Sequence, residues 1–196
     1  MPDDLRLFFK QTLTKPHQIV ALAPSSAQLC AQMVAEIDPK GGKVVELGAG
    51  TGNITQAILA TGLPATDLHC IEMNPAFCAR LRARFPPAHI HEMSAGDLGD
   101  LGDLGLSNVQ CVVSGLPLLS MPIDLQRAII KGSLALLGEN GSFVQFTYGP
   151  KAPLAASLQR EFALTARRSA KIWWNLPPAR VYRFERASAR VTQAAE

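Results

Sequence analysis

The residues with the clearest chemical pattern are glycines at a predicted turn between a strand and a helix. The apolar run KVVEL, residues 43–47, continues into GAGTGN and gives an E-x-G-x-G-x-G arrangement of Glu46, Gly48, Gly50 and Gly52. Glycines at such a turn permit tight backbone geometry and let a ligand lie against the main chain. The dinucleotide fingerprint G-x-G-x-x-G is not matched, because the third glycine follows the second after one residue instead of two. The pattern predicts a nucleotide-type pocket.

Two acidic residues at the ends of later strands extend this pocket. Glu72 lies in IEMN, twenty residues after Gly52, where a carboxylate can accept hydrogen bonds from both hydroxyls of a ribose. Asp97 lies in AGD, at the end of the next expected strand, where a carboxylate suits the exocyclic amine of adenine. Taken alone, each acid is more often a solvated loop residue. Together with the glycines, they predict a site for an adenosine-containing ligand.

Alternating strands and helices position these residues. Short runs rich in β-branched residues predict strands, and apolar residues at helical spacing predict helices. The strands are expected at 43–47, 67–72, 88–93, 108–114 and 142–148, and the helices at 54–60, 76–85 and 125–137. An earlier helix begins after Pro24 with Ser25 or Ser26 as its cap. The alternation predicts a parallel, doubly wound α/β sheet.

Turn-forming residues mark several boundaries. Asn74 and Pro75 open the helix at 76–85, and Gly138 closes the helix at 125–137. The repeat GDLGDLGDLG, residues 96–105, predicts a loop or a poor helix. The pattern of residues 169–188 predicts two strands joined at Pro177 and Pro178, which would form an antiparallel hairpin that closes the sheet.

Composition and charge restrict the class of protein. We expect one domain from 196 residues. No apolar run approaches the roughly 18 residues that span a bilayer, and the charged N-terminus lacks the apolar core of a signal peptide, so a cytoplasmic protein is expected. The four cysteines have neither CxxC nor metal-ligand spacing, which predicts reduced core residues and no metal site.

Positive charge is concentrated near the C-terminus. Residues 151–196 carry nine Lys or Arg against three Asp or Glu, whereas residues 1–150 carry ten against thirteen. This asymmetry indicates an anionic partner such as lipid phosphate or nucleic acid, with a solvated strand face as the alternative.

The N-terminal segment has an amphipathic pattern. Residues 3–15 predict a helix that ends at Pro16. Its apolar and basic residues at helical spacing are Leu5, Phe8, Phe9, Arg6 and Lys10. The helix either packs on the core or lies in a membrane interface, where two phenylalanines and flanking cations are useful.

The ordered glycines and acids resemble the class I S-adenosylmethionine-dependent methyltransferases over roughly residues 40–150. The resemblance implies a Rossmann-like fold: a seven-stranded, mostly parallel sheet with an antiparallel last strand, helices on both faces, and the cofactor across the carboxyl ends of the strands. The glycines would face the amino-acid part of the cofactor, Glu72 the ribose and Asp97 the adenine. The implied cofactor contacts are Ser25, Ser26, Glu46, Gly48, Ala49, Gly50, Thr51, Gly52, Glu72, Met73, Asp97, Leu98 and Ser114. The demethylated product would be S-adenosylhomocysteine, and no metal is required.

The uncharged loop VVSGLPLLSMP, residues 112–122, lies where this family places the transferred methyl group. Methyl transfer is an in-line displacement in which the cofactor supplies the electrophile, so the protein need only align a neutral nucleophile. The residues expected to border the reacting atoms are Ser114, Gly115, Leu116 and Tyr148. An amine acceptor that loses its proton to water or to a nearby polar group would need no catalytic acid.

The same loop discriminates among substrates. Methyltransferases acting on nucleic-acid adenines carry patterns such as N-L-P-Y, in which the aromatic residue stacks on the base. Here Gly115 replaces the Asn and Leu118 replaces the aromatic. Stacking is worth about 1 to 3 kcal/mol per base, so the loss of the aromatic residue weakens the case for a nucleic-acid substrate. An rRNA adenine N6-methyltransferase is therefore the alternative interpretation and not the leading one.

Six stretches together resemble the small bacterial phospholipid N-methyltransferases: FFKQTLTKP, ALAPSS, ELGAGTG, SGLPLLSMP, QFTYGP and PPARVYRFER. The resemblance implies stepwise methylation of phosphatidylethanolamine, through mono- and dimethyl intermediates, to phosphatidylcholine. It also implies a peripheral enzyme on the inner face of a bacterial cytoplasmic membrane, whose N-terminal helix binds anionic lipid, and no nucleic-acid partner. Tyr148 would bond the phosphate or the amine, and Arg180 or Arg183 would pair with the phosphodiester.

The resulting arrangement is a membrane-binding helix at 1–16, a cofactor-binding core at 17–150 and a C-terminal helix and hairpin at 151–196. Trp173 and Trp174 would face opposite sides of a strand, so at most one lines a pocket. His17 and His91 show no partner spacing. The oligomeric state stays open, and a non-catalytic sensor of the cofactor is a further alternative.

Overall fold

A single sheet of seven strands, in the order β3-β2-β1-β4-β5-β7-β6, organises the computed structural model. The structure describes residues 27–103, 105–148, 151–172 and 178–187. The strands are β1 Val44–Leu47, β2 Leu68–Glu72, β3 His89–Glu92, β4 Val109–Ser114, β5 Leu137–Thr147, β6 Leu164–Arg168 and β7 Arg180–Arg186. β1 to β5 pair in parallel, and β7 lies antiparallel between β5 and β6. The predicted mostly parallel sheet with an antiparallel last strand is confirmed.

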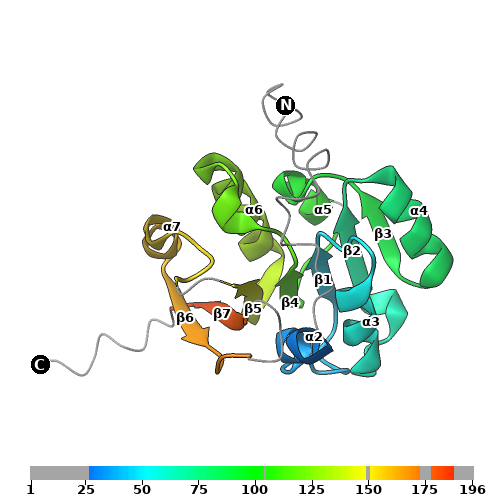
Figure 1. The fold of residues 1–196 in the computed structure, drawn as a ribbon. Helices are drawn as coiled ribbons and strands as arrows, with labels where there is room; N and C mark the ends of the chain where they lie inside the picture. Colours follow the sequence, from blue (N-terminus) through cyan, green and yellow to red (C-terminus); the bar gives the residue numbers. More distant parts are fainter. Residues whose placement is uncertain (1–26, 104, 149–150, 173–177, 188–196) are drawn as a thin grey trace, which may run out of the picture.

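Helices cover both faces of the sheet (Figure 1). One face carries α2 Ala27–Val34, α3 Asn53–Ala60 and α4 Pro75–Arg84, and the other carries α5 Gly99–Asp103, α6 Ile123–Leu136 and α7 Ala156–Glu161. Short 3-10 helices lie at η3 Ala65–Asp67, η4 Ala95–Asp97 and η5 Leu118–Ser120. None of the helices in the described ranges has the length and apolar character to cross a bilayer.

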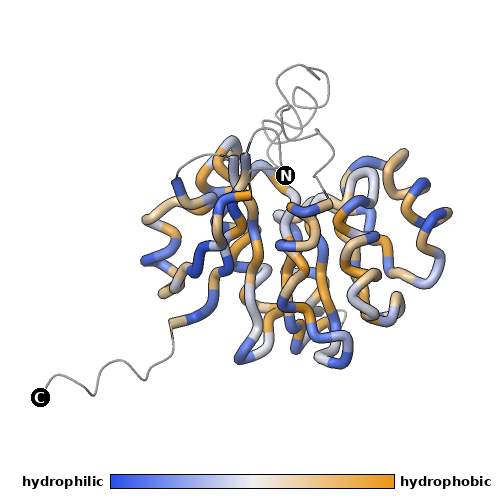
Figure 2. The backbone as a smooth tube through the Cα atoms, turned by 60° about the horizontal axis from the view of Figure 1, so that its bottom comes forward, coloured by the Kyte–Doolittle hydropathy of each residue, from blue (hydrophilic) through white to orange (hydrophobic). Residues whose placement is uncertain are grey.

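The polarity of the strands follows their place in the sheet. The four positions of β1, at the centre, are all buried, as expected for a parallel strand covered on both faces. The edge strands β3 and β6 have no fully buried position. Figure 2 shows the same contrast, with apolar colour along the central strands and polar colour at the periphery. Polar edges discourage pairing with other chains.

The start of α4 follows the predicted capping signal. The Asn74 side-chain oxygen accepts hydrogen bonds from the backbone N–H groups of Ala76, at 2.9 Å, and Phe77, at 3.4 Å. Pro75 is the first helical residue, where its missing N–H costs nothing. Within its described residues, the GDLGDLGDLG repeat contributes to the short η4 and forms the five-residue α5, as expected for a poor helix.

The junction between α6 and β5 differs from the prediction. Gly138 does not close the helix: α6 ends at Leu136, and β5 begins at Leu137, whose backbone is extended with φ −66° and ψ 133°. Leu137 pairs with Val109 on β4, and its side chain is buried. Burying a leucine contributes about 1.5 to 3 kcal/mol, and this tertiary gain draws the residue into the sheet ahead of the glycine.

The C-terminal hairpin also begins earlier than predicted. Its second strand, β7, lies where expected, but its first strand, β6, precedes residue 169. β6 is an edge strand with mostly exposed side chains, so it carries no apolar alternation that a sequence pattern could detect. Ile172 and Ala179 form an isolated bridge. Trp173 and Trp174 lie outside the described residues, as do the N-terminal helix, Ser25 and Ser26.

All four cysteines are buried, which confirms the predicted core residues. Burial raises the pKa of Cys111 to about 11 and raises the pKa of Cys70 further.

Candidate active site

The glycine-rich turn joins β1 to α3 in a backbone conformation that favours glycine. Gly48, Gly50 and Gly52 have φ values of 71°, 52° and 84°. A Cβ at Gly52 would lie 2.8 Å from the ring of Phe85, and a Cβ at Gly48 would lie 2.6 Å from the Leu116 side chain. Two of these glycines are therefore required both by the turn and by close packing.

Glu72, the last residue of β2, is bonded to the glycine-rich turn. Its Oε2 accepts a hydrogen bond from the Gly50 N–H at 2.9 Å, and its Oε1 accepts one from the Asn74 N–H at 2.8 Å. The residue is 9% exposed. Because a carboxylate oxygen can accept more than one hydrogen bond, both oxygens retain acceptor capacity for ribose hydroxyls.

Glu46 is buried beside the same turn, with no ion pair to any residue that the structure describes. Its Oε2 accepts hydrogen bonds from the Thr55 hydroxyl, at 2.6 Å, and from the Cys70 thiol, at 3.5 Å. Its Oε1 has no hydrogen-bond partner within the described part of the chain. Burial raises the pKa of Glu46 from 4.5 to about 7, and the Thr55 bond opposes this shift. The spare acceptor suits the ammonium of an amino-acid ligand.

Asp97 ends η4, the short helix that follows β3. Its side chain is half-buried, and burial raises its pKa, assisted by the negative charge of Asp100. The neighbouring Leu98 is buried in the core, and Met73 is half-buried after Glu72. Because β1, β2 and β3 are parallel, their carboxyl ends meet at one edge of the sheet. The structure therefore brings the predicted glycines, ribose acid and adenine acid to the same edge.

The loop after β4 packs directly on the glycine-rich turn. The Gly115 N–H donates to the carbonyl of Leu47 at 2.8 Å, and the Leu116 N–H donates to the Ser114 hydroxyl at 3.3 Å. A Cβ at Gly115 would lie 3.2 Å from the Gly48 carbonyl oxygen. Ser114, Gly115 and Leu116 therefore border the predicted cofactor turn.

Tyr148 and Arg180 lie at the same edge, one strand farther along. Arg180 pairs with Thr147 at the end of β5, and Tyr148 is the next residue of the chain. The half-buried Tyr148 ring meets Phe146 edge-on, with 5.2 Å between ring centroids. It packs on the core that α2 and α3 cover.

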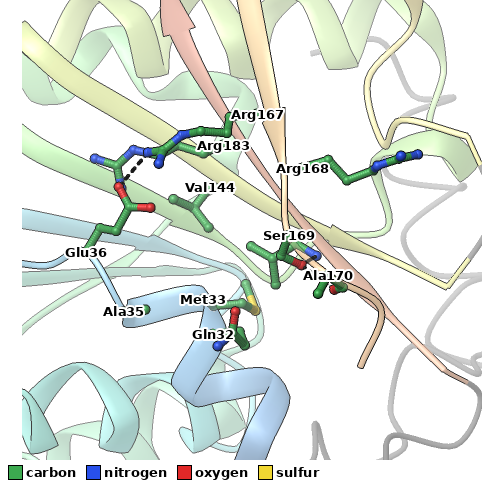
Figure 3. A pocket seen from close by; sticks show the side chains of 11 residues that line it. Gln32, Met33, Ala35, Glu36, Val144, Arg167, Arg168, Ser169, Ala170 and Arg183 are labelled. Carbon is green, nitrogen blue, oxygen red and sulfur yellow. Dashed lines mark hydrogen bonds and ion pairs between the residues drawn. The ribbon is translucent and has the colours of Figure 1, made fainter. Parts of the chain in front are cut away.

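Arg183 lies farther from this edge than Arg180 and has carboxylate partners. It pairs with Val144 across β5 and β7. Its guanidinium nitrogens lie 3.1 Å from Glu36 and 2.8 Å from Glu185. Figure 3 shows Arg183 and Glu36 in a pocket of about 260 Å³ between α2 and the hairpin. Of the two predicted phosphate-binding arginines, Arg180 is thus the one at the carboxyl edge, beside Tyr148.

Three histidines gather on β2 and β3, a cluster that the sequence does not reveal. His69 Nδ1 lies 3.1 Å from His91 Nε2, and the rings of His69 and His89 stack with centroids 4.5 Å apart. Burial, with a smaller contribution from the neighbouring histidines, lowers the pKa of His69 from 6.5 to about 4. The sequence shows His89 and His91 as an H-x-H run, but His69 lies on the preceding strand, and only the strand register pairs His69 with His89.

The site fits S-adenosylmethionine. The turn at 48–52 and Glu46 would hold the amino-acid part, Glu72 the ribose and Asp97 the adenine. Among the residues that the structure describes, no group of three or more His, Cys, Asp or Glu is arranged to hold a metal ion.

This fold, with its glycine-rich turn and two edge carboxylates, defines a class I S-adenosylmethionine-dependent methyltransferase. The structure of 1,6-didemethyltoxoflavin-N1-methyltransferase from Burkholderia thailandensis, solved with S-adenosylhomocysteine, shares the fold with a TM-score of 0.66 and 14% identity. The similarity covers 95% of this chain and 91% of that one. No family model matches the chain.

A sequence relative narrows the family. The chain is 36% identical over 152 residues to the ornithine lipid N-methyltransferase of Singulisphaera acidiphila, covering 75% of the chain and 79% of the relative. The chain therefore belongs to the class I S-adenosylmethionine-dependent methyltransferases, in the same family as the Singulisphaera acidiphila relative. A shorter match, 39% over 67 residues, is to the ribosomal RNA small subunit methyltransferase A of Burkholderia multivorans, covering 33% of the chain and 24% of that relative.

Proposed function

We propose that this methyltransferase acts on the amine headgroup of a membrane lipid, converting phosphatidylethanolamine stepwise to phosphatidylcholine. The observation that carries the lipid assignment is the 36% identity to a protein named as a lipid N-methyltransferase. The same observation favours a second acceptor, the amine of ornithine lipid. Both acceptors present a primary amine on a lipid headgroup, so one site chemistry serves either.

The chemistry asks little of the protein beyond alignment. The bound cofactor supplies an electrophilic methyl group on a sulfonium. The chain's own residues hold the acceptor amine in line with it and exclude water. Leu116, packed on Gly48, forms an apolar wall beside the turn. Tyr148 and Arg180, at the end of the neighbouring strand pair, would bind the headgroup phosphate.

Exposed apolar side chains near the site support a lipid substrate. Within the described residues, two large apolar side chains are exposed: Leu119, at 51%, and Ile123, at 41%. Leu119 lies in η5, within the loop after β4, and Ile123 is the first residue of α6, directly after this loop. Such side chains can insert among acyl chains while the headgroup amine enters the site.

The rRNA adenine alternative has less support. Leu118 stands where a base-stacking aromatic residue would be, and its side chain is buried in the core at 1% exposure. The loop therefore offers no stacking platform at this position. The match to the ribosomal RNA enzyme covers only 24% of that protein.

We further propose a peripheral location on the inner face of the bacterial cytoplasmic membrane. The amphipathic pattern at 3–15 and the basic C-terminal part motivate this placement. Removing residues 1–16 should weaken sedimentation with vesicles of phosphatidylglycerol while leaving the affinity for S-adenosylhomocysteine unchanged. Equal sedimentation of the truncated and full chains would contradict the role of the helix.

The deciding experiment is lipid mass spectrometry of cells that lack phosphatidylcholine and express this chain. Methylated phosphatidylethanolamine species should accumulate, and the Glu72→Ala variant should not produce them. A second arm supplies the purified chain with labelled cofactor and vesicles containing either phosphatidylethanolamine or ornithine lipid, or with rRNA. Transfer to ornithine lipid alone would select the second acceptor, and transfer to rRNA alone would overturn the lipid proposal.

A further inference from the structure

A buried glutamine lies beneath the loop that borders the methyl-transfer site. Gln145, on β5, is 1% exposed and pairs in register with Ser114 of β4. Its Nε2 donates to the carbonyl of Leu116 at 2.9 Å and to that of Phe146 at 3.2 Å. Its Oε1 is buried with no hydrogen-bond partner in the described ranges.

Two hydrogen-bond donors, the Gln145 side chain and a backbone N–H, occupy the Leu116 carbonyl oxygen. The N–H of Leu118 donates to the same oxygen at 2.9 Å, so both lone pairs of the Leu116 carbonyl have donors. This carbonyl therefore anchors the loop and is not available to accept a hydrogen bond from an incoming amine. On the opposite side, the Leu116 side chain lies against Gly48.

The unpaired oxygen of Gln145 indicates why a glutamine stands here. A buried acceptor without a donor is unfavourable, and an apolar side chain of similar shape would avoid it. The amide is useful only through its donor end, which holds the loop.

We propose that Gln145 is a positioning residue for methyl transfer. By holding the Leu116 carbonyl, it fixes the wall formed by Leu116 over the glycine-rich turn and so sets the position of the acceptor amine relative to the methyl group. The proposal rests on the proposed function in one respect, namely that this loop borders the acceptor.

Three variants test the proposal. Gln145→Met keeps the shape and removes the donor. Gln145→Glu keeps the shape and restores a donor only when its carboxyl is protonated, a form that burial favours. Gln110→Met is the control, because the Gln110 Nε2 also donates to loop carbonyls, those of Asp38 at 2.9 Å and Gly42 at 2.8 Å, but lies near the amino ends of β1 and β4, away from residues 112–122.

Gln145→Met should lower kcat by about 10- to 100-fold, with the dissociation constant of S-adenosylhomocysteine within about threefold of wild type. The Leu118 amide should exchange its hydrogen about tenfold faster, because its acceptor is no longer fixed. The ratio of the Gln145→Glu rate to the wild-type rate should rise as the pH falls from about 8.5 to about 6, because the protonated carboxyl donates to the Leu116 carbonyl. Gln110→Met should leave kcat unchanged.

A kcat for Gln145→Met equal to that of wild type would overturn the proposal. A loss of cofactor affinity as large as the loss in kcat would also overturn it, because it would indicate a general structural role. A flat ratio for Gln145→Glu would also contradict it. The exchange measurement needs no lipid, so it separates failure of this inference from failure of the lipid proposal, which the wild-type transfer assay tests.

Discussion

At the scale of single residues, Glu72 connects two parts of the cofactor site. One carboxylate oxygen accepts a hydrogen bond from the N–H of Gly50 in the turn after β1, and the other accepts one from the N–H of Asn74 at the start of α4. The carboxylate therefore orders the turn even without ligand. Loss of its charge should affect cofactor binding twice, through the ribose contact and through the shape of the turn.

Glu72→Gln should weaken binding of S-adenosylhomocysteine by about 10- to 100-fold, because one backbone N–H would then face an amide donor. Isothermal titration calorimetry measures the change. Glu92→Gln is the matched control, since Glu92 pairs in register with Glu72 on β3 and is exposed in an ion pair with Arg82. Equal affinities of Glu72→Gln and wild type would exclude Glu72 from the site.

Glu46 makes folding of the ligand-free protein depend on pH. Burial raises its folded-state pKa to about 7 from 4.5, so its contribution to stability is fully present below pH 4.5 and is lost as the pH rises through 7. Glu46→Gln removes this titration. Wild type should lose stability relative to Glu46→Gln as the pH rises from about 5 to about 8. The difference between their free energies of unfolding should change by about 3 kcal/mol at most over this range. Urea denaturation at both pH values measures it, and parallel pH profiles would refute the assignment.

At the scale of elements, the tight contact between α3 and α4 depends on a glycine. Gly52 has φ 84° and would place a Cβ 2.8 Å from Phe85, whereas Gly105 has φ 82° and would place its Cβ in open space. Gly105→Ala should cost about 1 kcal/mol of stability through backbone strain alone. Gly52→Ala should cost about 1 to 3 kcal/mol more through overpacking. Equal thermal denaturation midpoints for the two variants would show that the contact relaxes freely.

The segment η5 presents the loop's apolar surface. Leu119→Ser should weaken association with lipid vesicles by about tenfold, because it removes one leucine that we propose inserts among acyl chains. Leu119→Met keeps the apolar area and should bind as wild type does. Sedimentation with vesicles gives both values, and unchanged binding by the serine variant would remove this loop from the membrane-facing surface.

Sequence patterns located most elements because local signals and tertiary packing agreed. The strand at β1, the cap at Asn74 and the glycine-rich turn all follow from short-range rules. The exceptions have a tertiary origin: Leu137 joins the sheet because it is buried against β4, and β6 is held by pairing with β7 without an apolar face. The contact between Gln145 and Leu116 spans 29 residues and requires the register of β4 and β5.

At the scale of the whole molecule, the histidine cluster opposes Glu46 in its effect on pH stability. The pKa of His69 falls to about 4 from 6.5, so its contribution to stability is present above pH 6.5 and is lost as the pH falls toward 4. His69→Asn should therefore lose less stability than wild type between pH 6.5 and pH 4.5. Urea denaturation across this range measures the difference, and identical slopes would contradict it.

Because every cysteine is buried, the reactivity of the thiols can be used to follow unfolding of the protein. Cys30, Cys70, Cys78 and Cys111 are between 0% and 4% exposed, on elements from α2 to β4. A maleimide reagent can alkylate them only in molecules whose sheet and helices have separated. The rate at which the thiols are modified therefore reports how often the fold opens, and saturating the protein with S-adenosylhomocysteine should lower this rate by the factor by which the ligand reduces the unfolded population.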